Sequence, residues 1–179
     1  LLKISGKLFL IEISSGTALK NKIRVNFLNS VPLKQEVLFV KEFVNDWFDL
    51  STDIRPFYTF AKKDKLLNKI VKKYFGLRLI GIPDLFEALT WAIIGQQINL
   101  TFAFKLKRKF VEKYGEMLKF ENNTYFIYPE FERISKIQKA DLLKLQFSKQ
   151  KAEYVIETAK AFCKFLDLYG ELLSTTLRL

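Results

Sequence analysis

The chain has 179 residues, of which 49% are hydrophobic and 27% charged, a composition typical of a globular protein with a buried core. It contains no histidine and one cysteine, Cys163. This excludes a disulfide framework, Ser-His-Asp and Cys-His catalytic sites, and zinc sites built from the usual His or Cys ligands. The formal net charge of +11 favours a polyanionic partner, nucleic acid before an acidic membrane surface, against the alternative of a solvated lysine-rich surface.

The basic residues are unevenly distributed along the chain. Residues 61–81 contain seven basic residues and one acidic residue, and residues 103–165 contain fourteen basic and eight acidic ones. Residues 82–102 between them have two acidic residues and no basic one. The sequence therefore predicts two basic segments that flank a nearly uncharged one.

The first part of the chain predicts a small antiparallel sheet followed by one helix. Apolar and polar residues alternate in Lys22–Phe27, which is the pattern of a half-buried strand, and Lys7–Ile13 reads as a second, more apolar strand. From Glu36 to Phe48 the apolar residues recur at helical spacing. We expect an N-terminal domain of sheet plus helix over residues 1–50 and a helical domain over residues 51–179.

The next segments predict two contrasting helices. Asp64–Phe75 has one apolar stripe with lysines covering the rest, and Gly76 follows as a C-terminal cap. Asp84 is a strong N-cap, and Glu87 three residues later completes a capping-box pattern. The helix that follows, to about Gln97, is nearly all apolar and is therefore expected to be buried.

The remainder of the chain is predicted to be mostly helical. Asn99 can cap a helix that runs to Tyr114, and the short apolar run Thr124–Tyr128 follows. Two short helices are expected near residues 130–136 and 139–146. Ser148 is expected to cap a long helix that ends at Tyr169 with Gly170 as its terminator. The predicted fold class is α+β, a small N-terminal antiparallel sheet followed by a helical bundle.

The block Gly95-Gln96-Gln97 is an unusual end for an apolar helix. An amide that is buried without a hydrogen-bond partner costs about 1–3 kcal/mol. The two glutamines therefore either bond to neighbouring loops at a polar helix end or point into a cleft and contact a ligand.

The run Gly76–Leu89, with Ala92–Ile98 after it, closely resembles the helix-hairpin-helix DNA glycosylases. The nearest branch is the 3-methyladenine DNA glycosylase II family of alkylation repair, which typically shows "GLR…DPFE…AI(I/L)GQQ(I/V)S" here. Leu142–Ala152 resembles the helix junction of that family, with Gln146 in place of the usual glycine, and Asn99 replaces a usual serine. The resemblance covers about residues 46–165, and its most specific part is the Gly-Gln-Gln block.

The resemblance implies an enzyme of base-excision DNA repair that rotates a damaged nucleotide out of the duplex and hydrolyses its N-glycosidic bond. Matched to the family motif, Gln97 falls on the residue that fills the vacated gap, and Gln96 borders the base pocket. No cofactor and no metal are implied. The partner would be double-stranded DNA with a damaged base, without membrane contact, and the protein would be a cytoplasmic, nucleoid-associated bacterial monomer.

The basic run on the helix after these glutamines suggests contacts with the DNA backbone. Lys105, Arg108 and Lys109 are the candidates, and the alternative is a solvated basic face. Asp49 and Asp53 lie near each other in sequence and could form an acid–base pair, but a capping role before Arg55-Pro56 is favoured.

The chain departs from the family pattern after the segment of resemblance. The family has a Gly-rich hairpin that grips DNA phosphates, followed by a catalytic aspartate. No Gly-x-Gly hairpin with a following aspartate occurs in the 179 residues. The chain is therefore expected to be a fragment without catalytic residues, inactive by itself. The alternatives are a non-catalytic helical DNA-binding module and a scaffold with a basic surface that binds no nucleic acid.

Overall fold

The computed structural model describes residues 1–16 and 22–176, and the chain falls into two compact units. Unit 1 joins Leu1–Val31 to the chain from Asp84 onward, and unit 2 is Pro32–Pro83. The described residues form antiparallel strand pairs and helices joined by loops, so the predicted α+β class is confirmed. The expected domain boundary at residue 50 lies inside unit 2, and the division into 1–50 and 51–179 stays a prediction.

The N-terminal strands of unit 1 form two separate antiparallel pairs, where the sequence predicted a single strand over Lys7–Ile13. That prediction is wrong because the backbone N–H of Leu10 donates to the side-chain oxygen of Asn29 at 2.7 Å, which interrupts the strand. The residues before this break pair with the first strand, and the residues after it pair with the fourth. The four strands are β1 (Leu2–Ile4), β2 (Lys7–Phe9), β3 (Ile11–Ser15) and β4 (Ile23–Phe27).

A third hairpin, which the sequence did not predict, joins β5 (Met117–Phe120) to β6 (Asn123–Phe126). Its two-residue turn contains Glu121 with a φ of +52°. Hairpin turns of this kind usually carry glycine where φ is positive, so the turn leaves little signal in the sequence.

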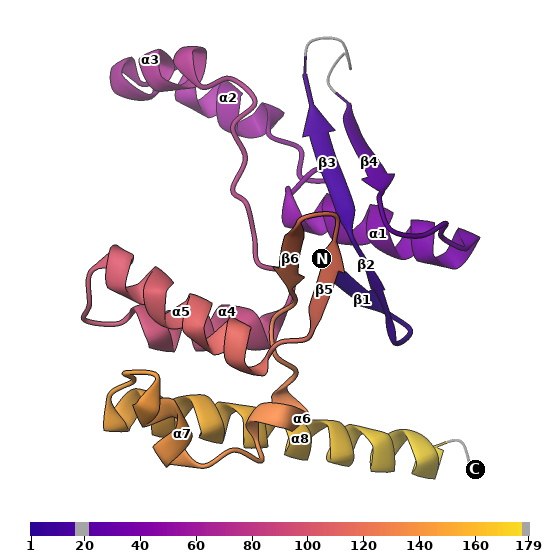
Figure 1. The fold of residues 1–179 in the computed structure, drawn as a ribbon. Helices are drawn as coiled ribbons and strands as arrows, with labels where there is room; N and C mark the ends of the chain where they lie inside the picture. The colour runs from indigo at the N-terminus through magenta and orange to yellow at the C-terminus, as the bar shows by residue number, and fades with distance from the viewer. Residues whose placement is uncertain (17–21, 177–179) are drawn as a thin grey trace. The chain divides into compact units, whose positions relative to one another are not determined.

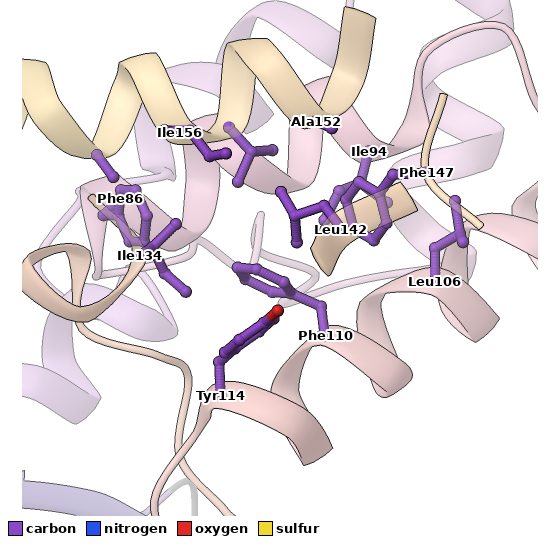
Figure 2. Close-up of a cluster of buried hydrophobic side chains, with 12 residues drawn as sticks. Phe86, Ile94, Leu106, Phe110, Tyr114, Ile134, Leu142, Phe147, Ala152 and Ile156 are labelled. Carbon is purple, nitrogen blue, oxygen red and sulfur yellow. The ribbon is translucent and has the colours of Figure 1, made fainter. Parts of the chain in front are cut away.

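The helices of unit 1 pack around one apolar core (Figure 2). The longest helix, α8, contacts α4, α6 and α7, and it lies along the two short helices in Figure 1. The helices are α4 (Leu85–Gly95), α5 (Leu100–Tyr114), α6 (Phe131–Ile134), α7 (Lys139–Lys144) and α8 (Lys149–Thr176). The buried core residues are Phe86, Ile94, Leu106, Phe110, Tyr114, Ile134, Leu142, Phe147, Ala152, Val155, Ile156 and Ala159.

The predicted helix starts in unit 1 are confirmed, with one difference in detail. Asp84 accepts from the backbone N–H of Glu87 at 2.6 Å, and Asn99 accepts from that of Phe102 at 2.8 Å. The Glu87 carboxylate, however, accepts from Lys107 instead of completing a capping box. Ion pairing across two helices has replaced the local contact that the sequence pattern suggested.

The end of α8 differs from the prediction. The helix continues through Gly170 to Thr176, although Gly170 was expected to terminate it. A single glycine inside a helix costs only about 1 kcal/mol relative to alanine. That cost does not end the helix.

Unit 2 contains three helices among its residues. The predicted helix over 36–48 is found about two residues earlier, and the helix predicted over 64–75 is shorter at its C-terminal end. Asp64 caps it by accepting from the N–H groups of Leu66 and Leu67, and Gly76 has a φ of +86°. The bounds are α1 (Lys34–Trp47), α2 (Arg55–Ala61), which the sequence did not predict, and α3 (Lys65–Lys73).

Candidate nucleic-acid interface

The turn between α4 and α5 carries both candidate glutamines. The helix α4 is fixed in the core by Phe86, Thr90 and Ile94, which are 0–3% exposed. It ends at Gly95, and the backbone of the next residue, Gln96, is extended, with φ of −61° and ψ of 134°. The expectation of a helix buried all round is wrong, because Leu85 and Leu89 on another face of α4 are 62% and 44% exposed. The buried face nevertheless anchors α4, so the residues of this turn project from a helix that is fixed in the core.

The side chains of Gln96 and Gln97 are exposed at this turn. Within the described part of the chain, neither side chain has a hydrogen-bond partner. The structure therefore gives no support to the alternative in which the amides bond to neighbouring loops. Exposure is what a gap-filling residue requires, and the role itself stays a prediction.

The backbone of Gln97 is in the left-handed region, with a φ of +55°. A residue with a β-carbon pays a steric cost of about 1–2 kcal/mol there, and such strained residues cluster at functional sites. Hydrogen-bonding side chains contact the backbone on either side of Gln97, Lys151 before it and Asn99 after it. This conformation could not be predicted from the sequence, because glutamine is not a residue that usually adopts it.

One of those groups is Lys151, in the first turn of α8. Its ammonium donates to the backbone oxygens of Ile94 at 2.6 Å and Gln96 at 2.7 Å. Partial burial lowers the pKa of Lys151 from its ordinary value. A lysine that hydrogen-bonds the last carbonyls of a helix also compensates the negative end of the helix dipole. Sequence reasoning missed this residue because its partners lie more than fifty positions away.

The three candidate backbone contacts on α5 differ in their surroundings. Lys105 is exposed, and within the described residues it has no hydrogen bond or ion pair. Arg108 pairs with Glu112 at 2.7 Å. Lys109 donates to the side-chain oxygen of Gln146 at 2.6 Å. All three positive charges remain at the surface or partly exposed, so contact with phosphate stays a prediction for each.

Lys107, the remaining cation of that run, has a structural role. Its ammonium lies 2.7 Å from the Glu87 carboxylate, 4.9 Å from the centre of the Trp91 ring and 5.7 Å from that of Tyr128. The hydroxyls of Tyr128 and Thr90 lie 2.6 Å apart. Burial raises the pKa of Tyr128, so the phenol stays protonated. This network ties α4 to α5 and helps to fix the turn that joins them.

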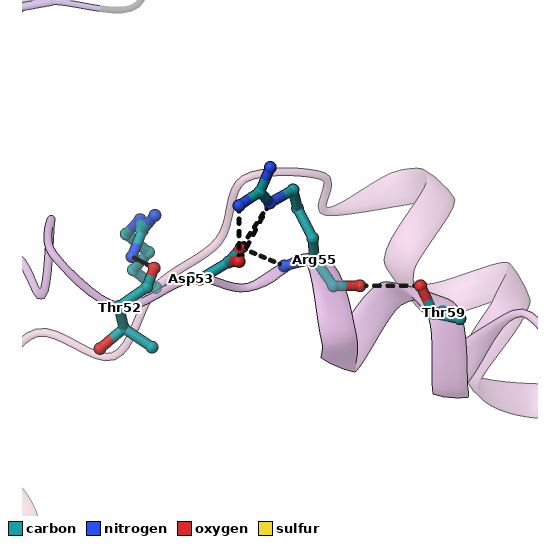
Figure 3. A network of polar contacts seen from close by, with 5 residues as sticks. Thr52, Asp53, Arg55 and Thr59 are labelled. Carbon is teal, nitrogen blue, oxygen red and sulfur yellow. Dashed lines mark hydrogen bonds and ion pairs between the residues drawn. The ribbon is translucent and has the colours of Figure 1, made fainter.

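The two aspartates considered as an acid–base pair both make local contacts in unit 2. Asp53 accepts from the backbone N–H of Arg55 at 3.0 Å and from its guanidinium at 2.8 Å (Figure 3). Asp49 accepts a hydrogen bond from the hydroxyl of Thr52, and its carboxylate lies 3.8 Å from the guanidinium of Arg78. Asp53 bonds the first residue of α2, but the N-cap position is Ile54 and α2 has no side-chain cap hydrogen bond, so the favoured capping role is not found in its simple form. Asp49 makes its contacts in the loop that precedes α2.

Two family models match the sequence of the chain. Residues 90–172 match the model described as the HhH-GPD superfamily base excision DNA repair protein, and residues 5–89 match the N-terminal domain of 8-oxoguanine DNA glycosylase. The chain belongs to the helix-hairpin-helix DNA glycosylases. The resemblance found in the run from Gly76 to Ile98 is confirmed.

Relatives of this chain are named DNA-3-methyladenine glycosylases. It is 44% identical to the DNA-3-methyladenine glycosylase of Bacillus subtilis over 138 residues, which are 76% of this chain and 46% of the relative. It is 34% identical to DNA-3-methyladenine glycosylase 2 of Escherichia coli over 86 residues, 48% of this chain and 30% of the relative. The chain thus spans less than half the length of the relatives it matches.

Solved structures share the fold. The 3-methyladenine DNA-glycosylase from Archaeoglobus fulgidus has a TM-score of 0.76 at 24% identity, and the match covers 89% of this chain and 53% of that one. The 8-oxoguanine glycosylase/lyase of Clostridium acetobutylicum, in complex with double-stranded DNA, has a TM-score of 0.67 at 20% identity, with coverages of 90% and 51%. Over residues 1–16 and 22–176, no helix is both long and apolar enough to cross a membrane.

Proposed function

We propose that this chain acts in base excision on duplex DNA that carries an alkylated base, as part of a hydrolase of the DNA-3-methyladenine glycosylase II type. The names of the relatives support this proposal. The observation that carries it is Gln97, an exposed residue in a left-handed conformation at the end of a helix anchored in the core. The protein would act as a monomer on its DNA.

In this proposal Gln97 fills the gap that a flipped nucleotide leaves. A base inside a duplex cannot be reached, and its rotation out of the stack costs a few kcal/mol. A side chain that enters the gap offsets part of this cost. The stem of a glutamine supports the neighbouring bases, and its amide can hydrogen-bond the base left without a partner. Gln96, one residue earlier, would border the pocket that receives the damaged base.

The basic side chains of α5 would hold the duplex in register. Contacts to phosphate carry no sequence information, but they fix the position of the protein on the duplex. Lys105 is available without breaking any contact among the described residues, whereas Arg108 would have to leave Glu112 and Lys109 would have to leave Gln146. We therefore rank Lys105 first among the three.

Cleavage would proceed through a sugar cation, because an alkylated base is already a good leaving group. A carboxylate next to the sugar would stabilise that cation and position water, as in glycoside hydrolysis. The 179 residues contain no Gly-x-Gly hairpin followed by an aspartate. We propose that the chain by itself binds duplex DNA and does not excise bases.

The test uses the 179-residue chain and two measurements. The first compares its affinity for a duplex with an abasic-site analogue and for the matched undamaged duplex, with tighter binding of the abasic duplex expected. The second incubates it with duplex carrying an alkylated purine, followed by alkali, and strand breaks are expected at the level of the no-protein control. Equal affinity for both duplexes would overturn the gap-filling role. Breaks above the control would show that a catalytic group lies within these residues.

A further inference from the structure

The α4–α5 turn is stabilised from outside by one side chain. Lys151 reaches from the first turn of α8 and bonds the oxygens of Ile94 and Gln96, 57 and 55 positions away in sequence. We call this pair of hydrogen bonds the Lys151 bridge. It joins the last residues of α4 to α8, the helix that covers the core.

The Lys151 bridge acts directly on the backbone of Gln97. The oxygen of Gln96 belongs to the peptide plane that leads into Gln97, and a peptide plane rotates as one rigid body. A hydrogen bond to that oxygen therefore constrains the rotation about φ of Gln97. On the other side of the turn, the cap of α5 at Asn99 fixes the chain by its bond to Phe102.

The conformation that is constrained in this way is unfavourable by itself. A non-glycine residue persists in the left-handed region only where its surroundings determine it. The side chain of Gln97 has no hydrogen bond within the described residues, so it does not itself stabilise the left-handed conformation. The Lys151 bridge lies on one flank, and on the other Ile98 packs against the core and Asn99 caps α5. Of these contacts, the bridge is the one that hydrogen-bonds the strained peptide.

We propose that Lys151 is a positioning residue, which holds Gln97 in the left-handed conformation that directs its side chain into the gap of the duplex. The proposal rests on the proposed function of Gln97. A chain without the bridge would let Gln97 relax to ordinary backbone angles, which turns its side chain away. Lys151 would then act on damaged DNA without touching it.

The first measurement needs no DNA. In the full chain, the three-bond coupling between the amide and α protons of Gln97, together with its carbonyl and α-carbon shifts, reports φ by NMR. Lys151→Met removes both hydrogen bonds and keeps the apolar stem. We expect the Gln97 signals to move away from the left-handed values in Lys151→Met. Lys151→Arg keeps charged donors at that place and should retain them.

The second measurement compares affinities for the abasic-site duplex and the undamaged duplex. In Lys151→Met the preference for the abasic duplex should fall by about tenfold, the scale of one lost hydrogen-bonded group. Lys164→Met removes the same charge from an exposed position later in α8 and should keep the preference. In a Gln97→Gly background, Lys151→Met should change the preference no further, because the side chain to be positioned is gone.

The outcomes separate the two proposals. If the unchanged chain shows no preference for abasic DNA, the proposed function fails, while the NMR measurement still decides whether Lys151 sets the backbone of Gln97. If the unchanged chain prefers abasic DNA and Lys151→Met keeps both that preference and the left-handed signals, the inference about Lys151 is wrong. Should Lys151→Met not fold, Lys151→Gln, a shorter neutral donor, replaces it in the same comparison with the same expected losses.

Discussion

The ammonium of Lys109 donates a 2.6 Å hydrogen bond to the side chain of Gln146, the residue that stands where the family usually has glycine. Gln146 follows α7 with a φ of +76°. Its N–H bonds the oxygen of Leu143, and the N–H of Phe147 bonds that of Leu142, which is the Schellman pattern of a helix end. Gln146 therefore has a strained backbone that glycine would not have. Its hydrogen bond with Lys109, a candidate DNA-binding residue, partly offsets this strain.

Gln146→Gly should stabilise the protein by up to about 1.6 kcal/mol. Glycine removes a steric cost of about 1–2 kcal/mol for the left-handed conformation. Its greater freedom in the unfolded chain lowers the free energy of unfolding by about 0.4–1 kcal/mol, so only the difference is gained. The measurement is chemical denaturation of both proteins. Gln138→Gly is the matched control, because Gln138 has a φ of −88° and offers no such relief. Equal effects at both positions would contradict the argument.

How much could be predicted from the sequence depends on the range of each interaction. The caps at Asp84 and Asn99 were predicted because a capping side chain bonds to the backbone two or three residues ahead. The exposed turn at Gln97 was also predicted, because the polar residues of the Gly-Gln-Gln block are an unusual end for an apolar helix. The contacts of Lys107 and Lys151 could not be predicted, since their partners come from other helices and no local pattern encodes them.

A second limit is conformational. Turn prediction relies on glycine and asparagine as markers of positive φ. Glu121, Gln146 and Gln97 all have positive φ without being either residue. The hairpin β5–β6 was missed for this reason, and the strain at Gln97 was missed with it.

Gly115→Ala should destabilise the protein by about 1–3 kcal/mol, the usual cost of forcing an extra methyl group into filled space. A β-carbon at Gly115 would lie 2.2 Å from the backbone oxygen of Ile127 and 2.6 Å from that of Val111. Neither is a flexible side-chain end. Gly95→Ala is the control, since no atom lies within 4 Å of its β-carbon position, and it should leave the free energy of unfolding equal or higher. Thermal unfolding distinguishes the two, and a tolerated Gly115→Ala would show that the α5–β5 junction can shift.

The stability of unit 2 should depend on pH through Asp53. Hydrogen bonds from the Arg55 side chain and backbone lower the pKa of the Asp53 carboxyl to about 2, below its ordinary value of 3.8. Because the folded-state value is the lower one, the contribution to stability is present above about pH 4 and is lost as pH falls from about 4 to 2. NMR titration of the Asp53 carboxyl carbon measures the value directly. Asp53→Asn should remove this part of the pH dependence, and a midpoint near 4 would contradict the contact in Figure 3.

Duplex affinity should fall with salt, and Lys105 should contribute most to the dependence. Each phosphate neutralised adds about −0.9 to the slope of log affinity against log salt concentration. Lys105→Met should therefore make the slope shallower by about 1. Arg108→Met and Lys109→Met should change it less, because these side chains give up a contact with Glu112 or Gln146 to reach the phosphate. Fluorescence titrations at several salt concentrations give the slopes, with Lys164→Met as the control. A flat salt dependence in the unchanged chain would favour a scaffold that binds no nucleic acid.

Gln97→Ala should weaken binding to a duplex with an abasic or flipped-out site by about 1–3 kcal/mol, the range assigned to one stacked or hydrogen-bonded group. Fold stability should change by no more than about 0.5 kcal/mol, because the Gln97 side chain is exposed and has no partner within the described residues.

Two further variants distinguish the effect of the Gln97 side chain from the effect of its backbone strain, because alanine still has the unfavourable φ of +55°. Gln97→Gly relieves the strain and lacks the side chain, and should also lose affinity. Gln97→Asn keeps an amide and tolerates the left-handed region, and should retain part of it. Abasic-site affinity that survives both Ala and Gly, or a Gln97→Ala protein that unfolds, would mean that this residue serves the fold and that another side chain fills the gap.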